Sequence, residues 1–119
     1  MNYSKFNTLP YKFAYGCNFY KKPYSIVKIN VDNPDESWEH EFELPSEPVF
    51  VENPNGQSED DGVLLVMCQT KQSYYLSILD AKDLSEIAKA DLSTIPIEST
   101  GGFTFHGFFA DNINYKDLV

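Results

Sequence analysis

The sequence predicts an all-β fold built from antiparallel meander blades. Aromatic residues make up 15% of its 119 residues, and aromatic and β-branched residues favour strands. Short apolar runs alternate along the chain with clusters of Gly, Pro, Asn, Asp and Ser, which are typical of turns. The links between successive runs have the length of hairpin loops, so neighbouring strands are expected to be antiparallel.

Eight segments are predicted as strands, because each is a short apolar or alternating run bounded by turn residues. In chain order they are Tyr11–Phe19, Ser25–Val31, Ser37–Leu44, Pro48–Asn53, Gly62–Thr70, Tyr74–Ala81, Glu86–Leu92 and Phe103–Ala110. Two stacked four-stranded meanders would make two blades of a β-propeller. Two blades alone leave open edges, which indicates a piece of a larger body.

The turn signals between these runs are consistent from one link to the next. "KKP" separates the first two runs and "DNPDE" precedes "SWEHEFEL", in which charged and apolar residues alternate. Further along the chain, "ENPNGQSEDDG", "TKQS" and "DAKDLS" have turn or loop composition. The run "VLLVM" is apolar on both faces, as expected for a strand covered on both sides.

The segment "AKDLSEIAKADL" is open to two interpretations. Its apolar residues lie near helical spacing, which would suit a short helix. Alternation through Ile87, Lys89 and Asp91 after a turn favours a strand. We predict the strand.

The charge of the chain disfavours two classes of partner. Nine Lys plus Arg stand against eighteen Asp plus Glu, a net charge of −9. Nucleic acid binding needs a basic face that neutralises phosphates, and anionic lipid also attracts basic surfaces. We therefore expect no nucleic acid partner and no electrostatic docking on lipid. No run approaches the roughly 20 apolar residues of a membrane-spanning helix, so no integral membrane segment is predicted.

The two cysteines, Cys17 and Cys68, are far apart and in no CxxC or CxxH spacing. This pattern disfavours a disulfide framework and a zinc site. We expect both to be small buried hydrophobic residues in a reducing compartment. Residues 1–16 lack the apolar segment of a signal peptide, and the expected location is cytoplasmic.

His106 is the first candidate for chemistry, in the stretch "GGFTFHGFFADN". It is either a packing residue on a half-buried strand or a metal ligand in a dry site. Phe105 and Phe108 would supply apolar surroundings, and Gly107 removes bulk beside the ring. A neutral imidazole in such surroundings is a good ligand for a transition metal. The residues alone leave both interpretations open.

Glu47 is the second candidate, between Ser46 and Pro48 in "LPSEPVF". It is either a surface carboxylate in a turn or an inward-pointing one. An inward carboxylate could accept the Nδ1–H of a ligating histidine and so fix its tautomer.

Two further features are predicted to be structural. His40 shares a strand face with Phe42 by the period of two, which predicts a partly buried packing role. "SEDDG" (Ser58–Gly62) lacks the ligand spacing of a calcium loop and is predicted as a solvated hairpin turn closed by Gly62. A calcium-binding acidic domain at Glu59–Asp61 is a minor alternative. HExxH, GxSxG, Walker and glycine-rich dinucleotide motifs are all missing from the sequence.

Three blocks of the sequence together resemble the C-terminal portion of the carotenoid cleavage oxygenases. This family includes the β-carotene oxygenases and the retinoid isomerase of pigment epithelium. The blocks are "PSEPVFVENPNGQSEDDGVLL" (Pro45–Leu65), "YLSILDAKDLSEIAKADL" (Tyr75–Leu92) and "FTFHGFF" (Phe103–Phe109). Their order and spacing match the family, and "FHGFF" lies near the chain end, as the family's last motif does. The resemblance covers about Tyr11–Phe109 and is closest to the animal-type members.

The resemblance implies a seven-bladed β-propeller with Fe(2+) on its axis, bound by four histidines. Glutamates orient three of these ligands. His106 matches the last ligand, Glu47 matches the glutamate that orients it, and His40 matches none. Phe103, Phe105 and Phe108 would line or support the substrate tunnel.

The remaining ligands would belong to preceding blades. Residues 1–119 are therefore expected to be a single C-terminal portion of about two blades, with 110–119 as a tail past the usual end of the family.

The implied activity is that of a non-haem Fe(II) dioxygenase. Such an enzyme uses O2 to cleave a C=C bond of a carotenoid or retinoid oxidatively, giving carbonyl products without an organic cofactor. Isomerase chemistry is one alternative, and a non-catalytic propeller remnant or interaction module is another. A portion with one iron ligand is expected to be inactive by itself, and any peripheral membrane contact would involve other parts of the full protein.

Overall fold

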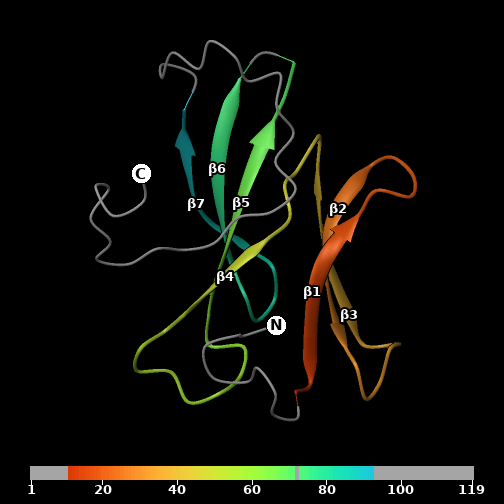
Figure 1. Ribbon diagram of the computed structural model, residues 1–119, viewed down its shortest axis with the longest axis vertical. Helices are drawn as coiled ribbons and strands as arrows, with labels where there is room; N and C mark the ends of the chain where they lie inside the picture. Colours follow the sequence, from red (N-terminus) through yellow and green to blue (C-terminus); the bar gives the residue numbers. More distant parts are fainter. Residues whose placement is uncertain (1–10, 72, 93–119) are drawn as a thin grey trace, which may run out of the picture.

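The computed structural model of the chain describes residues 11–71 and 73–92, and these residues form seven β-strands. The strands are β1 (Phe13–Asn18), β2 (Tyr24–Asn30), β3 (Ser37–Phe42), β4 (Val49–Glu52), β5 (Gly62–Gln69), β6 (Tyr74–Asp80) and β7 (Glu86–Asp91). They form two antiparallel sheets (Figure 1). The first sheet has the order β1-β2-β3 and the second the order β4-β5-β6-β7. The predicted meander is therefore confirmed over this part of the chain.

Strand alternation explains which face of each sheet is buried. In β5, Leu64, Val66 and Cys68 are at most 1% exposed, whereas their neighbours Val63 and Leu65 on the other face are only half-buried. The same period appears in β3, where exposed Glu residues alternate with the partly buried His40 and buried Phe42. Successive side chains of a strand point to opposite faces, so one face of each sheet supplies the core.

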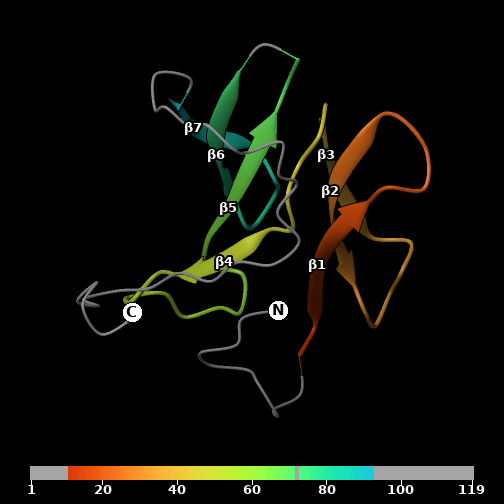
Figure 2. The ribbon, with the colours of Figure 1, turned by 45° about the horizontal axis from the view of Figure 1, so that its top comes forward.

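One hydrophobic core lies between the two sheets, which face each other in both ribbon views (Figure 2). Ile26 and Phe42 come from the first sheet, and Leu64, Val66 and Leu79 from the second. Aromatic side chains surround this cluster and pack against it; they are Tyr15, Trp38, Phe50 and Tyr75. Burial of these apolar surfaces is the main stabilising contribution to the pairing of the two sheets.

Lys28 is fully buried in the middle strand of the first sheet. Its Nζ atom forms an ion pair with Asp60 (2.8 Å) and donates a hydrogen bond to the carbonyl of Lys82 (2.8 Å). Nζ also lies 4.0 Å and 4.6 Å from the ring centroids of Phe13 and Trp38. Buried charges require pairing and hydrogen bonds, and the aromatic faces add cation–π attraction. Lys28 thus connects the first sheet to the β4–β5 loop and to the β6–β7 turn.

The β6–β7 turn, residues 81–85, is docked on the first sheet through its backbone. Each strand of that sheet donates one side-chain hydrogen bond to a different carbonyl of the turn. The three bonds are Tyr15 Oη to Ala81 O (2.9 Å), Lys28 Nζ to Lys82 O (2.8 Å) and His40 Nδ1 to Leu84 O (3.1 Å). These three hydrogen bonds therefore fix the turn backbone against the first sheet.

The boundary between the sheets falls after the third strand, so the first four predicted segments do not form one four-stranded meander. Val49–Glu52 pairs with β5 and opens the second sheet. The chain leaves β3 at Phe42, and Pro45 then forms a β-bridge with Cys68 of β5. The carbonyl of Leu44 already accepts from Gln69 N of β5 (3.0 Å), so the chain reaches the second sheet within two residues of the end of β3.

The predicted strand at 86–92 is confirmed, because Glu86–Asp91 is β7, and the alternative of a short helix there is wrong. The last predicted strand, Phe103–Ala110, lies outside the described residues.

Candidate functional site

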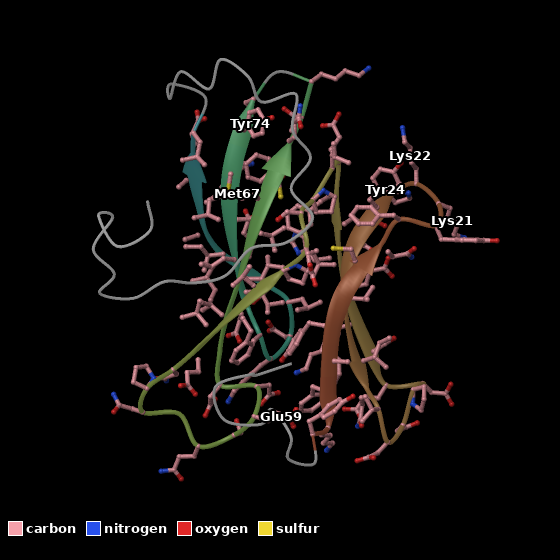
Figure 3. All side chains as sticks on the ribbon, in the orientation of Figure 1. Lys21, Lys22, Tyr24, Glu59, Met67 and Tyr74 are labelled. Atoms are coloured by element: carbon pink, nitrogen blue, oxygen red, sulfur yellow. The ribbon has the colours of Figure 1, made fainter. Side chains whose placement is uncertain are left out.

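Glu47 lies in the link between the two sheets, residues 43–48, where the chain crosses from β3 to β4. Its side chain is exposed. Backbone hydrogen bonds fix the link on β5, since Gln69 N donates to Leu44 O (3.0 Å) and Ser46 N donates to Met67 O (2.7 Å). Met67 lies on β5, in the middle of the second sheet (Figure 3).

The residues beside Glu47 restrict its backbone. Pro48 follows it, and a residue before proline is confined to extended conformations. Ser46 precedes it and is only 9% exposed. The Ser46 hydroxyl oxygen accepts a hydrogen bond from Met67 N (3.0 Å) and donates one to Glu47 O (3.2 Å). An exposed carboxylate is thus carried on a well-fixed backbone.

The first sheet also contacts the link, through Cys17 of β1. The Cys17 thiol donates a hydrogen bond to Ser46 O (3.2 Å). Burial, together with the nearby Glu47 carboxylate, raises the pKa of Cys17 to about 11. Burial also raises the pKa of Cys68 to about 12. Both thiols are free; Cys68 is buried, as predicted, whereas Cys17 is only partly buried. Both are protonated at neutral pH.

His40 has the packing role predicted for it. Its Nδ1 donates to Leu84 O, because a carbonyl oxygen can only accept. Its ring lies 4.7 Å from that of Phe42, centroid to centroid. These contacts give the partly buried ring of His40 a structural role.

The acidic residues 59–61 form the predicted hairpin turn, and protein donors engage all three carboxylates. Glu59 accepts from the backbone N–H groups of Lys12 and Phe13, and Asp60 pairs with Lys28. Asp61 accepts from the N–H groups of Gln57 and Ser58 and pairs with Lys82 (2.8 Å). The carboxylates tie the loop to the first sheet and to the β6–β7 turn, so the arrangement favours the structural interpretation over a calcium site.

Across residues 11–71 and 73–92, no group of three or more His, Cys, Asp or Glu side chains is arranged to hold a metal ion. His106 lies outside the described residues, as do Phe103, Phe105 and Phe108. Glu47 is therefore the predicted site residue that the structure places. Within the same ranges, no helix has the length and apolar character needed to cross a membrane.

Sequence reasoning missed two residues of this region. Ser46 was noted only as a neighbour of Glu47, although its four hydrogen bonds fix the link. Lys28 was not singled out, although the period of two places it on the same strand face as Ile26, which is the signal that could have identified it as buried.

Comparison with known proteins identifies the family of this chain. The family model of the retinal pigment epithelial membrane protein, RPE65, matches residues 1–111. The chain belongs to this family. The predicted resemblance to carotenoid cleavage oxygenases is confirmed by curated relatives. The proteins named "Carotenoid-cleaving dioxygenase, mitochondrial" of Mustela putorius furo and Homo sapiens are each 36% identical to it, over 114 and 112 residues.

Two solved structures support the fold of this RPE65-family chain. A crystal structure of an ACO/RPE65 chimera superposes with a TM-score of 0.70 at 27% identity, covering 86% of this chain and 22% of that one. A variant of Synechocystis apocarotenoid oxygenase gives a TM-score of 0.61 at 29% identity, covering 71% of this chain and 20% of that one. These matches confirm the predicted all-β propeller class.

The chain spans about a fifth of the length of the curated relatives that it matches. The two dioxygenase matches cover 92% and 90% of this chain but 20% and 18% of the relatives.

Proposed function

We propose that these 119 residues serve as the C-terminal portion of a non-haem Fe(II) carotenoid or retinoid dioxygenase. The enzyme would use O2 to cleave a polyene C=C bond and give carbonyl products. The observation that carries this proposal is the family match over residues 1–111, together with curated relatives that are carotenoid-cleaving dioxygenases.

Within this proposal, His106 is an iron ligand and Glu47 orients it. The donor chemistry fits, because neutral imidazole suits Fe(II) and a carboxylate is the common partner of a ligating imidazole. Glu47 is exposed on a fixed backbone in the link between the sheets, and this backbone would hold the carboxylate in place beside the ligating imidazole. Iron bound there would supply the reactivity toward O2. The carboxylate would hold the imidazole in one tautomer and offset the positive charge of the centre.

Phe103, Phe105 and Phe108 are proposed to line or support the tunnel for the apolar polyene. A cytoplasmic location stays a prediction, and fractionation of cells that express the complete polypeptide tests it.

Two variants test the iron site in the complete polypeptide that contains these residues. His106→Ala should abolish iron loading and cleavage, and Glu47→Gln should weaken iron affinity or activity by roughly 10–100-fold. Iron per polypeptide, measured by mass spectrometry, and product formation from a carotenoid are the readouts.

Matched controls are available in the described residues. Glu43→Gln changes another exposed carboxylate of the same link, and His40→Ala removes the histidine that packs beside Phe42. Neither should change iron content. Wild-type iron content in both His106→Ala and Glu47→Gln would contradict the proposed site and would favour the alternative of a non-catalytic remnant or interaction module.

A further inference from the structure

Ser46 forms four hydrogen bonds immediately before the proposed orienting carboxylate. Its N–H donates to Met67 O (2.7 Å), and its hydroxyl oxygen accepts from Met67 N (3.0 Å). The hydroxyl donates to Glu47 O (3.2 Å), and its own carbonyl accepts from the Cys17 thiol (3.2 Å). The residue is 9% exposed, so these bonds are largely shielded from water.

These four bonds connect Ser46 to three parts of the structure: Met67 of β5, Cys17 of β1 and the adjacent Glu47. The two bonds to Met67 continue the ladder of β5 past the point where β4 pairs with it, using a side-chain oxygen in place of a backbone carbonyl. The Cys17 bond comes from β1 of the first sheet. The bond to Glu47 O is local and fixes the peptide that follows Glu47. Ser46 is therefore held by both sheets, and it holds Glu47 in turn.

The alternatives for the same contacts are limited. Pro45 and Pro48 have no N–H, so the backbone donors available between them belong to Ser46 and Glu47. A side-chain oxygen is needed at position 46 to satisfy Met67 N, because a buried N–H without a partner is costly. Alanine at this position would keep the Ser46 N–H bond but would lose both hydroxyl bonds.

We infer that Ser46 is a positioning residue for Glu47: its hydroxyl fixes the backbone from which the carboxylate reaches the metal-ligating histidine. This inference rests on the proposed function. The serine of "PSEPVF" would thereby determine where the Glu47 carboxylate lies. The Glu47 side chain is exposed and has several rotatable bonds, so its carboxylate can be positioned only if the backbone that carries it is fixed.

The test compares Ser46→Ala, Ser46→Thr and Glu47→Gln in the complete polypeptide. The readouts are iron per polypeptide and the rate of iron loss to a chelator, at a temperature well below unfolding of every variant. Ser46→Ala should speed iron loss by about 3- to 10-fold, less than the roughly 10–100-fold expected for direct loss of the carboxylate. Ser46→Thr keeps the hydroxyl and should restore most of the retention.

Ser77→Ala is the matched control. Ser77, like Ser46, is a buried serine; it lies in β6 of the second sheet, and its hydroxyl donates to Glu86 (2.7 Å). Its loss should lower stability without changing iron retention. Should Ser46→Ala not fold, Ser46→Cys offers a side chain of similar size with a poorer acceptor and gives the same comparison.

The outcomes separate the inference from the proposed function. Normal iron retention in Ser46→Ala with rapid loss in Glu47→Gln would overturn the inference alone. Equal iron loss in Ser46→Ala and Ser77→Ala would also overturn it, since the effect would then be general destabilisation. Normal retention in both Glu47→Gln and His106→Ala would overturn the proposed function, and the inference with it.

Discussion

At the scale of single residues, Lys28 illustrates how a charged side chain becomes part of a core. In "SIVKINV" it occupies an alternate position between Ile26 and Asn30, both of which are buried. Hydrophobicity alone assigns a lysine to solvent. Its burial depends on Asp60, 32 residues later in the sequence, and on rings from β1 and β3. Those partners come together only in the folded chain, so they could not be predicted from the local pattern.

Lys28→Met should destabilise the protein by about 3–5 kcal/mol, because removal of one partner leaves a charge unpaired at a partly buried site. Denaturant unfolding of the full chain measures this loss. The double variant Lys28→Met with Asp60→Asn should be less destabilised than the single variant, since no carboxylate is then left without its cation. A single variant within 1 kcal/mol of wild type, on the order of a surface ion pair, would contradict the assigned role.

The same pair predicts a pH dependence. Burial raises the pKa of Asp60, but the hydrogen bond and the charge of Lys28 outweigh it and hold this pKa below its usual value of 3.8. A lowered carboxyl pKa contributes stability that is present above about pH 4 and is lost as the pH falls further. In Lys28→Met this part of the acid-induced loss should disappear from unfolding curves measured between pH 5 and pH 2.

At the scale of elements, the start of β5 depends on a close approach that only glycine allows. A Cβ atom at Gly62 would lie 2.8 Å from Cζ of Phe50 and closer still to the carbonyl oxygen of Val51. Both neighbours belong to β4, which pairs with this end of β5. The sequence predicted Gly62 as the residue that closes the turn, and the reason proves to be strand contact.

Gly62→Ala should therefore destabilise the protein by about 1–3 kcal/mol through overpacking. Gly16→Ala is the matched control, because a Cβ there meets nothing within 4 Å. In a strand interior that change should be neutral or stabilising by up to about 1 kcal/mol. Thermal unfolding of the two variants measures the difference. Equal melting temperatures would show that β4 shifts to accommodate the added methyl group without loss of stability, which would contradict the prediction.

Strand positions were predictable because period-two alternation is a local property, and seven predicted strands are found with both ends within two residues of the observed ends. The boundary between the two sheets was not predictable in this way. It depends on whether residues 43–48 pair with β3 or with β5, and the decisive contacts are Ser46 with Met67 and Pro45 with Cys68. Those contacts join residues more than 20 positions apart, where a periodic pattern carries no information.

At the scale of the whole molecule, the two sheets are held together by a shared core and by polar contacts around it. Tyr15 takes part in both, since its ring packs beside Phe50 and its hydroxyl donates to Ala81 O. Burial raises the pKa of Tyr15 well above 10.0, and the charges of Asp60 and Glu59 raise it further. Tyr75 on the second sheet is raised in the same direction, chiefly by burial.

These shifts predict a loss of stability in alkali. A tyrosine whose pKa is raised on folding binds its proton more tightly in the native state, so stability is intact below about pH 10 and falls as the pH rises. Denaturant midpoints measured from pH 8 to pH 12 should decrease steeply above pH 10. Tyr15→Phe should be less stable at pH 8 but should decline less steeply, and a slope equal to wild type would contradict the assignment.

The docking of the β6–β7 turn has a consequence for sequence variation. The three side chains of the first sheet bind carbonyl oxygens, which every amino acid presents alike. The side chains at exposed positions 82, 83 and 85 can therefore be exchanged with little effect on these docking bonds, whereas one inserted or deleted residue would move all three acceptors at once. Natural or engineered variants of this turn should tolerate changes of identity far better than changes of length.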